Sequence, residues 1–274
     1  MLVLLPPSQG KAPAEQGDPV DLAALSWPSL TATRRRVLVA ASRLARTRAG
    51  REALGAGSEQ LRPEAERTTR WRTEPARPAA ELYTGVLFDA LDLPSLDDAA
   101  TARAHERVVV ASAAWGAVRL PDRVPGYRLS MGVPLPDLPR LATLWRDPLR
   151  AALDPVAEHG LVVDGRSADY AAAWTPRGDA AARTVSVRVL REVDGRRSVV
   201  SHMAKHTRGL VARALAVEPA EPTTPEDLRD LLAAALPPLV RDATAVSVRG
   251  AEGVAVELGE PARDGRRVLD VVLR

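Results

Sequence analysis

The sequence predicts an α+β fold, in which a mixed sheet packs against helices within a single domain over residues 1–274. Short runs of valine and leucine predict strands, and longer segments with apolar residues every three to four positions predict helices. The two kinds of segment follow one another without a regular βαβ alternation, so a mixed arrangement is expected. A hydrophobic content of 46% and a charged content of 27% are typical of a globular chain with a sizeable core.

In the N-terminal third, the LVLL run at residues 2–5 predicts a buried strand that two prolines end. Residues 33–54 predict a helix, because their apolar side chains fall on one face and arginines surround the other. Gly55–Gly57 stop this helix. A second helix is expected after it, capped by Ser58 and interrupted at Pro63.

In the middle of the chain, valine-rich and apolar runs predict strands over residues 106–113 and 126–135, and a third over residues 161–165. A short helix is expected after the third strand. Helical periodicity covers residues 138–160, where Pro148 and Pro155 would kink or break the helix.

The C-terminal third contains the clearest local pattern, a β-hairpin. Alternating valines lead to Asp194-Gly195, a favoured two-residue turn, and the chain returns in a second valine run. A helix that begins near Lys205 follows. A T-x-x-E capping box at Thr223 and Glu226 predicts the start of another helix, and valine-rich runs near the C-terminus predict two further strands.

Composition excludes several classes of protein and site. The chain has no cysteine, which excludes disulfides, thiolate catalysis and cysteine-bound metals. No apolar run approaches the roughly 18 residues that span a bilayer, and the N-terminal run is too short for a signal peptide. No Walker loop or G-x-G-x-x-G motif is present, so neither a nucleotide cofactor nor a metal is expected. We therefore expect a cytoplasmic protein without a membrane partner.

Two lysines stand out, because the other 36 residues of the 38 lysines and arginines are arginine. Lys11 follows the first predicted strand and Lys205 follows the hairpin, and sites are commonly built at strand ends. Lysine is a compact cation whose pKa falls on burial, so it can act as nucleophile, acid or base where arginine cannot. The alternative is that both are remnants of a codon bias towards arginine; we expect instead that they share one site.

At these positions the chain resembles the YaaA family of bacterial peroxide-stress proteins, the UPF0246 type. The resemblance rests on YTGVLFDAL at 83–91, on the segments 111–132 and 164–170, and on SHMAKHTRGLVAR at 201–213, in the family's order. Three family signatures are matched, by Tyr83-Thr84-Gly85, by Tyr127, Arg128, Met131 and Gly132, and by Ala204, Lys205, Arg208 and Gly209.

These signature residues are candidates for one shared cleft. The cleft candidates are Ser8, Lys11, Tyr83, Thr84, Tyr127, Arg128, Ser167, Tyr170, Lys205 and Arg208, of which Lys205, Lys11, Tyr127 and Tyr170 are candidates for catalysis. Two departures from the family pattern matter. Trp115 stands where the family usually has tyrosine, so a phenol is not essential there. The family's Asn-Leu-Ala-Ser appears as the segment 164–167 (DGRS), which weakens any role that needs the amide.

The resemblance implies a cytosolic protein induced by hydrogen peroxide, in a family linked to low free iron and to protection of DNA from oxidative damage. It also implies an unusual fold, DNA binding through a basic cleft, and a helix–hairpin–helix element.

A basic helical segment at about residues 31–77 supports DNA binding independently. From Arg34 to Arg77, twelve arginines stand against five glutamates, a balance of +7 in a chain whose net charge is +3. LGAGS at 54–58 resembles the hairpin of helix–hairpin–helix modules, whose glycine N–H groups approach a phosphate; a plain helix C-cap explains Gly55 equally well. The candidate DNA contacts are Arg34, Arg35, Arg36, Arg43, Arg46, Gly55, Gly57 and Arg70.

Three further patterns each have two interpretations. His202 and His206 are spaced as metal ligands on one helix face, but no third ligand accompanies them, so solvated or capping histidines are favoured. Asp122 could form an ion pair with Arg128 or simply hold a turn. Trp71 could stack on a base, although a tryptophan that covers a helix interface is the favoured interpretation.

Two functions are consistent with the sequence. The first is a peroxide-response protein that binds double-stranded DNA through its basic surface and so limits iron-driven oxidative damage. The second is an enzyme of unknown reaction that acts on a phosphorylated or nucleobase-like small molecule in a cleft lined by lysine, tyrosine and arginine. Direct iron sequestration has the least support, because the chain has no cysteine and four histidines.

Overall fold

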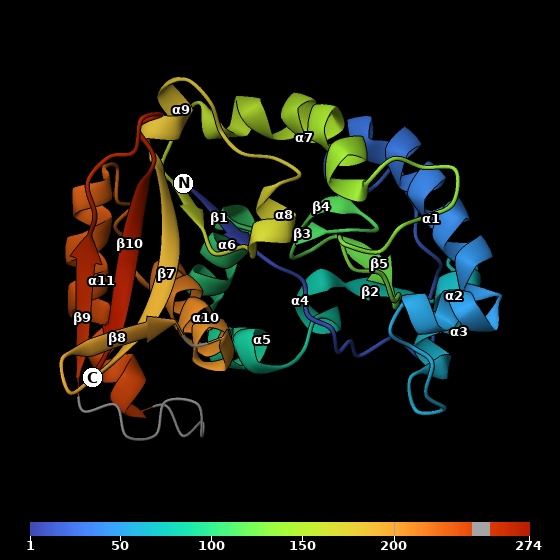
Figure 1. Cartoon of the computed structure of the whole chain (residues 1–274), viewed down its shortest axis with the longest axis horizontal. Helices are drawn as coiled ribbons and strands as arrows, with labels where there is room; N and C mark the ends of the chain where they lie inside the picture. The colour runs from blue at the N-terminus through green and yellow to red at the C-terminus, as the bar shows by residue number, and fades with distance from the viewer. Residues whose placement is uncertain (200, 243–252) are drawn as a thin grey trace.

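A computed structural model of the chain describes residues 1–199, 201–242 and 253–274, and shows a mixed sheet with helices packed around it (Figure 1). The eight-stranded sheet has the order β4-β3-β1-β6-β7-β10-β9, with β8 paired to β7. Its strands are β1 (Leu2–Leu5), β3 (Val108–Ser112), β4 (Gly116–Arg119), β6 (Val162–Asp164), β7 (Thr184–Val193), β8 (Arg196–Val199), β9 (Val254–Leu258) and β10 (Arg267–Leu273). The expected α+β class is confirmed.

The centre of the sheet is parallel. Strand β1 pairs with β3 on one side and β6 on the other, and β6, β7 and β10 continue in the same direction. Strands β4, β8 and β9 are antiparallel to their neighbours. The residues of β1 and β3 are all buried, as expected for parallel strands that are covered on both faces. The apolar sequence of these strands, with no polar alternation, follows from that burial.

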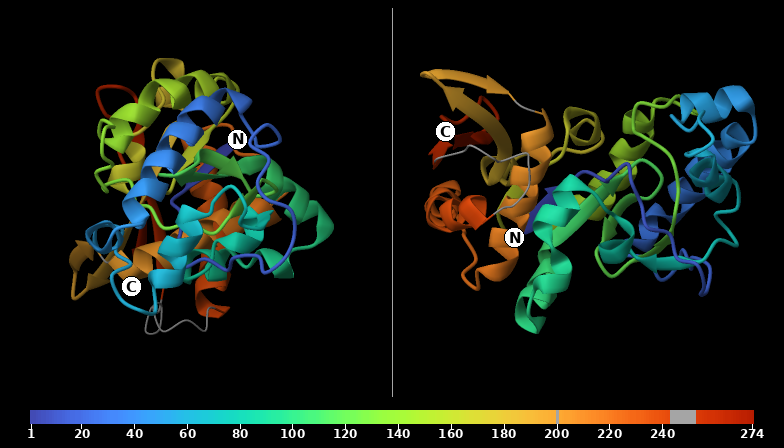
Figure 2. Two further views of the ribbon diagram at one scale, coloured as in Figure 1. Left: turned by 90° about the vertical axis from the view of Figure 1, so that its right-hand side faces the viewer. Right: turned by 90° about the horizontal axis from the view of Figure 1, so that it is seen from below.

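Helices lie on both sides of the parallel strands. In Figure 1, α7 runs along the top of the molecule, and α5 and α10 lie in its lower part. The helices are α1 (Thr31–Ala45), α2 (Arg48–Ala53), α3 (Arg62–Thr69), α4 (Ala79–Leu82), α5 (Val86–Leu91), α6 (Asp98–Arg107), α7 (Leu141–Ala157), α8 (Ala168–Ala171), α9 (Asp179–Ala182), α10 (Ser201–Val217) and α11 (Pro225–Asp242), with 3-10 turns η1 (Pro28–Leu30) and η2 (Leu93–Ser95). Helices α1–α3 form the end of the molecule opposite β9, β10 and α11 (Figure 2).

Helix α10 approaches α5 very closely at Gly209. A Cβ atom at this position would lie 2.1 Å from the carbonyl oxygen of Leu87 and 2.8 Å from the Cβ of Ala90. No side chain fits there, so glycine is needed for the two helices to pack. The close packing also fixes the position of Lys205 and Arg208, which lie within the preceding turn or so of α10.

Several local predictions are confirmed. In the β7–β8 hairpin both turn residues have positive φ, 49° at Asp194 and 74° at Gly195, which matches the twist of the two strands. Helix α10 contains Lys205, and the C-terminal runs form β9 and β10.

Other predictions are wrong in their details. Residues 126–135 form no strand, and the strand before them, β5 (Arg123–Pro125), pairs with β2 (Ala76–Pro78) in a separate two-stranded sheet. The helix expected over residues 33–54 divides into α1 and α2, because the Thr47 hydroxyl caps a new start by accepting from the N–H of Gly50 at 2.9 Å. Helix α7 continues through both of its internal prolines without ending at either.

Two helices begin somewhat later in the chain than the sequence predicted. Helix α3 begins at Arg62 rather than at Ser58, and Pro63 occupies its first turn, where a missing N–H costs nothing, instead of interrupting it. The capping box of α11 is formed by Thr224 and Asp227, whose side chains accept from each other's N–H groups, rather than by Thr223 and Glu226. Aspartate therefore takes the role that the pattern assigned to glutamate.

Among the residues that the structure describes, no helix is both long enough and apolar enough to cross a membrane.

Candidate functional site

A pocket of about 410 Å³ lies at the carboxyl ends of β1 and β6. Its walls come from the loop after β1, from the start of α5, from residues 128–131, from the loop and helix after β6, and from α10. The carboxyl edge of parallel strands is the usual position of ligand sites in sheets of this kind. The volume lies within the range of small-molecule sites.

The structure brings together eight of the ten residues predicted for the cleft. The pocket is lined by Ser8, Lys11, Thr84, Arg128, Ser167, Tyr170, Lys205 and Arg208. The other two, Tyr83 and Tyr127, are buried and do not line it, but both rings lie against the Lys11 side chain. Two lysines 194 positions apart in the sequence therefore share one pocket.

Lys11 is held inside the pocket wall by groups that carry no charge. Its ammonium donates to the carbonyl oxygens of Ser8, at 3.0 Å, and Gln9, at 3.4 Å, and lies 4.3 Å from the centre of the Tyr127 ring. Burial lowers the pKa of Lys11 to about 8; the charge of Glu64 opposes this shift and that of Arg128 adds to it. A lysine with this pKa is partly neutral at physiological pH and can act as a nucleophile or a base.

The loop that carries Lys11 is fixed against the segment that carries Thr84. The N–H of Ala12 donates to the carbonyl of Leu82 at 2.8 Å, and the N–H of Thr84 donates to the Ser8 hydroxyl at 3.2 Å. The proline-containing loop after β1 and the Tyr-Thr-Gly segment thus form one wall of the pocket.

A buried chain of hydroxyl groups lies beneath this wall. The hydroxyls of Tyr83 and Tyr127 are 3.0 Å apart, and that of Tyr127 is 2.7 Å from the hydroxyl of Ser112. The Ser112 oxygen also accepts from the N–H groups of Ala114 and Trp115. Burial raises the pKa of both phenols, so they remain protonated and serve as hydrogen-bond donors rather than bases.

Tyr170 lies on α8 and lines the pocket itself. Burial raises the pKa of its phenol above the ordinary value, and the nearby Tyr127 adds to the shift. The phenol of Tyr170 therefore stays protonated and can donate a proton or a hydrogen bond into the pocket.

Lys205 and Arg208 extend from α10 and differ in their surroundings. The Lys205 side chain is exposed and has no ion pair with any residue that the structure describes. Arg208 is half-buried and donates one hydrogen bond of 3.3 Å to the carbonyl of Val187, while its Nε is buried without an acceptor in the described part of the chain. Burial lowers the pKa of Arg208, and the charge of Asp164 opposes the shift.

Arg128 connects the pocket to α2 and α3. Its guanidinium binds Glu64 at 2.8 Å and the carbonyls of Leu54 and Gly55 at 3.2 and 3.1 Å. The alternative pairing with Asp122 is wrong. Asp122 instead accepts from the N–H groups of Ser26 and Arg119, which is the turn role.

The departure from the family pattern in the segment 164–167 is an internal ion pair. Two nitrogens of Arg166 donate to the two carboxylate oxygens of Asp164 at 2.9 and 2.8 Å, and the same guanidinium donates to the carbonyl of Trp174 at 2.8 Å. Burial opposes ionisation of Asp164, yet Arg166 holds its pKa below the usual value. The opposite charges of these two residues therefore neutralise each other. The N–H of Gly165, which stands between them in the chain, donates to the carbonyl of Leu4.

Arg34 is not a DNA contact, contrary to the prediction. Its side chain is 0% exposed and donates to the carbonyls of Trp115, Ala117 and Ser26 at 3.0, 2.9 and 2.8 Å. Burial lowers its pKa to about 10. Arg34 joins α1 to the sheet and to the loop before η1, so its role is structural.

Part of the charge of the basic segment is neutralised by ion pairs. All five of its glutamates form ion pairs: Glu52 with Arg48, Glu59 and Glu66 with Arg62, Glu64 with Arg128, and Glu74 with Arg67 and Arg70. Arg70, predicted to bind DNA, is one of these partners. Arg35, Arg36, Arg43 and Arg46 are exposed, and none has an ion pair within the described residues.

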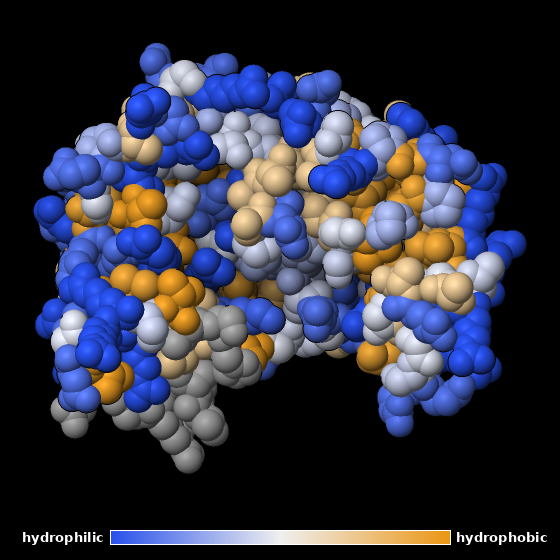
Figure 3. Space-filling model, in the orientation of Figure 1, coloured by the Kyte–Doolittle hydropathy of each residue, from blue (hydrophilic) through white to orange (hydrophobic). Residues whose placement is uncertain are grey.

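Three of these arginines line one shallow groove. Arg35, Arg36 and Arg43 extend from α1 around a groove of about 350 Å³, whose other wall is the loop at residues 136–138. Helix α1 crosses the end of the molecule that faces the viewer in the left panel of Figure 2. In the space-filling view, hydrophilic residues form much of the outer rim at this end (Figure 3).

The glycine turn at residues 54–58 ends α2 with a C-terminal cap. Gly55 has a φ of 67°, its N–H donates to the carbonyl of Glu52, and the N–H of Ala56 donates to that of Arg51. This pattern is a Schellman motif, the plain helix end that the sequence also allowed. Because these two N–H groups bind α2 itself, they are not available to a phosphate.

The remaining sequence patterns concern Trp71 and the two histidines of α10. Trp71 is buried, as a tryptophan at a helix interface would be. His206 is buried, and the side chain of His202 lies outside the described residues. Within the described part of the chain, no three histidine or acidic side chains cluster as metal ligands would.

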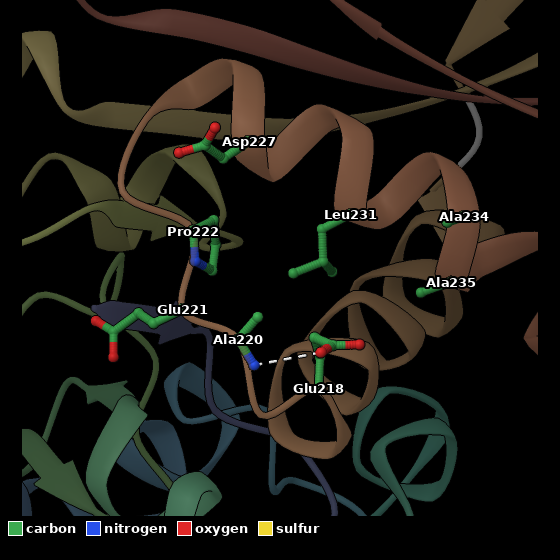
Figure 4. Close-up of a pocket in the computed structure, with 8 residues that line it drawn as sticks. All are labelled: Glu218, Ala220, Glu221, Pro222, Asp227, Leu231, Ala234 and Ala235. Carbon is green, nitrogen blue, oxygen red and sulfur yellow. Dashed lines mark hydrogen bonds between the residues drawn. The ribbon is translucent and has the colours of Figure 1, made fainter.

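A second, more open pocket of about 580 Å³ lies between the segment 218–222 and α11 (Figure 4). Its acidic side chains are already engaged. Glu218 accepts from the N–H of Ala220, Glu221 binds the N-terminal amino group of Met1, and Asp227 caps α11. We find no reactive group in it.

Matches to known proteins bear on the identity of the chain. A family model described as "Peroxide stress protein YaaA" matches residues 1–236. A UPF0246 protein of Streptomyces coelicolor is 47% identical over 271 residues, which cover 97% of this chain and 95% of that protein. UPF0246 proteins of Corynebacterium efficiens and Corynebacterium glutamicum strain R are each 40% identical, over 84% and 86% of this chain and 91% and 93% of their own lengths.

Proposed function

Because the chain belongs to the family of the peroxide stress protein YaaA, we propose that it acts in the peroxide response by binding double-stranded DNA. The observation that carries the proposal is the row of exposed, unpaired arginines on α1, around the groove defined by Arg35, Arg36 and Arg43. Bound to DNA in this way, the protein would help to limit iron-driven oxidative damage to it.

The spacing of these arginines supports contact with a phosphate backbone. Arg36 and Arg43 are seven residues apart, close to two turns of helix, so their side chains leave α1 on one side about 10.5 Å apart along its axis. Guanidinium groups bind phosphate oxygens in a fork, and they keep their charge at all physiological pH values. Such binding is independent of base sequence and is weakened by salt, since each bound phosphate releases counterions.

Fluorescence anisotropy of a labelled duplex, titrated with protein at several salt concentrations, tests this proposal. Wild-type protein should lose affinity linearly in log salt, and the double variant Arg35→Gln/Arg36→Gln should lower the slope by about 2. Arg62→Gln is the matched control, because that arginine is already paired with Glu59 and Glu66. Equal losses in the two variants, or duplex binding that ignores salt, would contradict the proposal.

A second candidate function is favoured by the pocket at the ends of β1 and β6. We propose that it acts on a small molecule, since Lys11, Lys205, Arg208 and three phenols gather in it or beneath it. The reaction is of unknown type, and the ligand is phosphorylated or nucleobase-like.

A further inference from the structure

We propose that the pocket binds an anionic carbonyl compound, whose anion is held by Lys205 and Arg208 and whose carbonyl carbon reacts with Nζ of Lys11. This inference rests on the second candidate function above, and it goes beyond that candidate by naming the reacting atom and the ligand class. It assigns the reacting amine to Lys11 and not to Lys205, which is the lysine of the family signature.

Burial, and not a carboxylate partner, determines the protonation of Lys11. Its Nζ contacts the carbonyls of Ser8 and Gln9 and the face of the Tyr127 ring, and it forms no ion pair with a described carboxylate. The carboxylate whose charge it senses, Glu64, is bound by Arg128. When Lys11 loses its proton, no carboxylate is left unpaired. About a tenth of the amine is neutral at pH 7 when its pKa is about 8, against less than about a thousandth for an ordinary lysine.

The rest of the pocket is suited to an anion. Its lining contains four cationic side chains, those of Lys11, Arg128, Lys205 and Arg208, and one described carboxylate, that of Asp169. Arg128 is occupied by Glu64, which leaves the two cations of α10 for a ligand.

Arg208 in particular has one acceptor among the described residues, the carbonyl of Val187. Its nearest buried carboxylate, Asp164, is already bound in bidentate fashion by Arg166, and its Nε has no acceptor in the described part of the chain. A buried donor without an acceptor is costly. A phosphate or carboxylate oxygen of the ligand would satisfy it, and the exposed ammonium of Lys205 would add a second charge.

The reaction is an addition followed by loss of water, and it needs no oxidant or reductant. The lone pair of the neutral Nζ forms a C–N bond to the carbonyl carbon, while the C=O π electrons move to oxygen, which takes up a proton. Nitrogen releases a proton, so the product is a carbinolamine. Loss of water from it gives an imine. The protonated phenol of Tyr170 lines the pocket and can donate the proton to oxygen.

Pyridoxal 5′-phosphate, an aldehyde that carries a phosphate, is a suitable probe. The full chain is treated with it and sodium cyanoborohydride at pH 7.5, and labelled peptides are quantified by mass spectrometry. The amines of this sequence are those of Lys11, Lys205 and the N-terminus. Mass spectrometry of the wild-type protein can therefore measure the labelling of each amine separately, without any substitution. We expect Lys11 to be labelled at least about 10-fold faster than Lys205.

Two comparisons test the anion site separately. Inorganic phosphate should compete with labelling of Lys11, and pyridoxal, which lacks the phosphate, should need an at least 10-fold higher concentration. Arg208→Gln should reduce this difference between the two probes, because one of the two cations that hold the phosphate is lost while Lys205 remains. Lys11→Arg, which keeps the charge, should remove the label from residue 11.

The outcomes separate the inference from the function on which it rests. Equal labelling of Lys11 by both probes, unaffected by phosphate, would overturn the anion site but leave a reactive amine in the pocket. Labelling of Lys205 faster than Lys11 would overturn the inference but leave the second candidate function, with Lys205 as the reactive amine of the pocket. Labelling of the N-terminus faster than both lysines would count against a reactive amine in the pocket, and so against both. The DNA proposal would be unaffected by any of these results, because its arginines lie on α1, outside this pocket.

Discussion

Replacement of Gly209 by alanine tests whether the contact between α10 and α5 holds the pocket in place. The new methyl group would lie 2.1 Å from a backbone oxygen of Leu87, about 1 Å inside a normal contact, and 2.8 Å from Ala90. Neither neighbour is the end of a flexible side chain, so α10 must move. Overpacking of this kind costs up to about 3 kcal/mol. Alanine returns about 1 kcal/mol as the better helix former, which leaves a net loss of about 2 kcal/mol.

Urea unfolding followed by circular dichroism measures this loss. For a chain of this size, the same loss should lower the midpoint temperature of thermal unfolding by roughly 4–8 °C. Gly132→Ala is the matched control, since a Cβ there meets nothing within 4 Å; it should stay within about 0.5 kcal/mol of wild type. The displacement of α10 also moves Lys205 and Arg208, so competition by phosphate should weaken in Gly209→Ala. A Gly209→Ala protein as stable as wild type would refute the packing argument.

Two further predictions concern buried cations. Arg34→Met should destabilise the protein by at least about 3 kcal/mol, because the carbonyls of Trp115, Ala117 and Ser26 lose their donor. Arg35→Met, at the exposed neighbour, is the control and should change the free energy of unfolding little. Equal effects of the two variants in urea unfolding would argue against the burial of Arg34. Wild-type stability should rise between pH 7 and 9.5. The reason is that the folded pKa of Lys11, about 8, lies below its unfolded value, so the unfolded state binds more protons in this range. Lys11→Met should remove that rise, on the order of 2 kcal/mol, and an identical pH profile in the variant would show that Lys11 titrates normally.

The sequence predicted the pocket better than it predicted the basic surface. Lys11 and Lys205 could be placed at one site because each follows a strand, and a strand end is a position that local pattern reveals. The Tyr-Thr-Gly and Ala-Lys-x-x-Arg-Gly signatures provided most of the remaining lining. Asp169 and the backbone of the loop after β1 were missed, because nothing in their types separates them from ordinary loop residues.

The basic surface shows why residue counts mislead. Arg34 and Arg35 are adjacent and identical in type, yet one is buried and the other exposed, because α1 presents its faces in turn to the sheet and to solvent. The glutamates of this segment pair locally at helical spacing, which the sequence could have shown. The pairing of Arg128 with Glu64 joins residues 64 positions apart, which no local pattern indicates.

The position of β1 has a consequence for how the chain reaches this structure. Strand β1 lies in the interior of the sheet, and its partners β3 and β6 are made more than 100 and nearly 160 residues later. During synthesis its apolar edges stay unpaired, so the nascent chain depends on a delayed, long-range closure of the kind that slows folding. The pocket forms later still, because its lining is complete only when Arg208 on α10 has been synthesised.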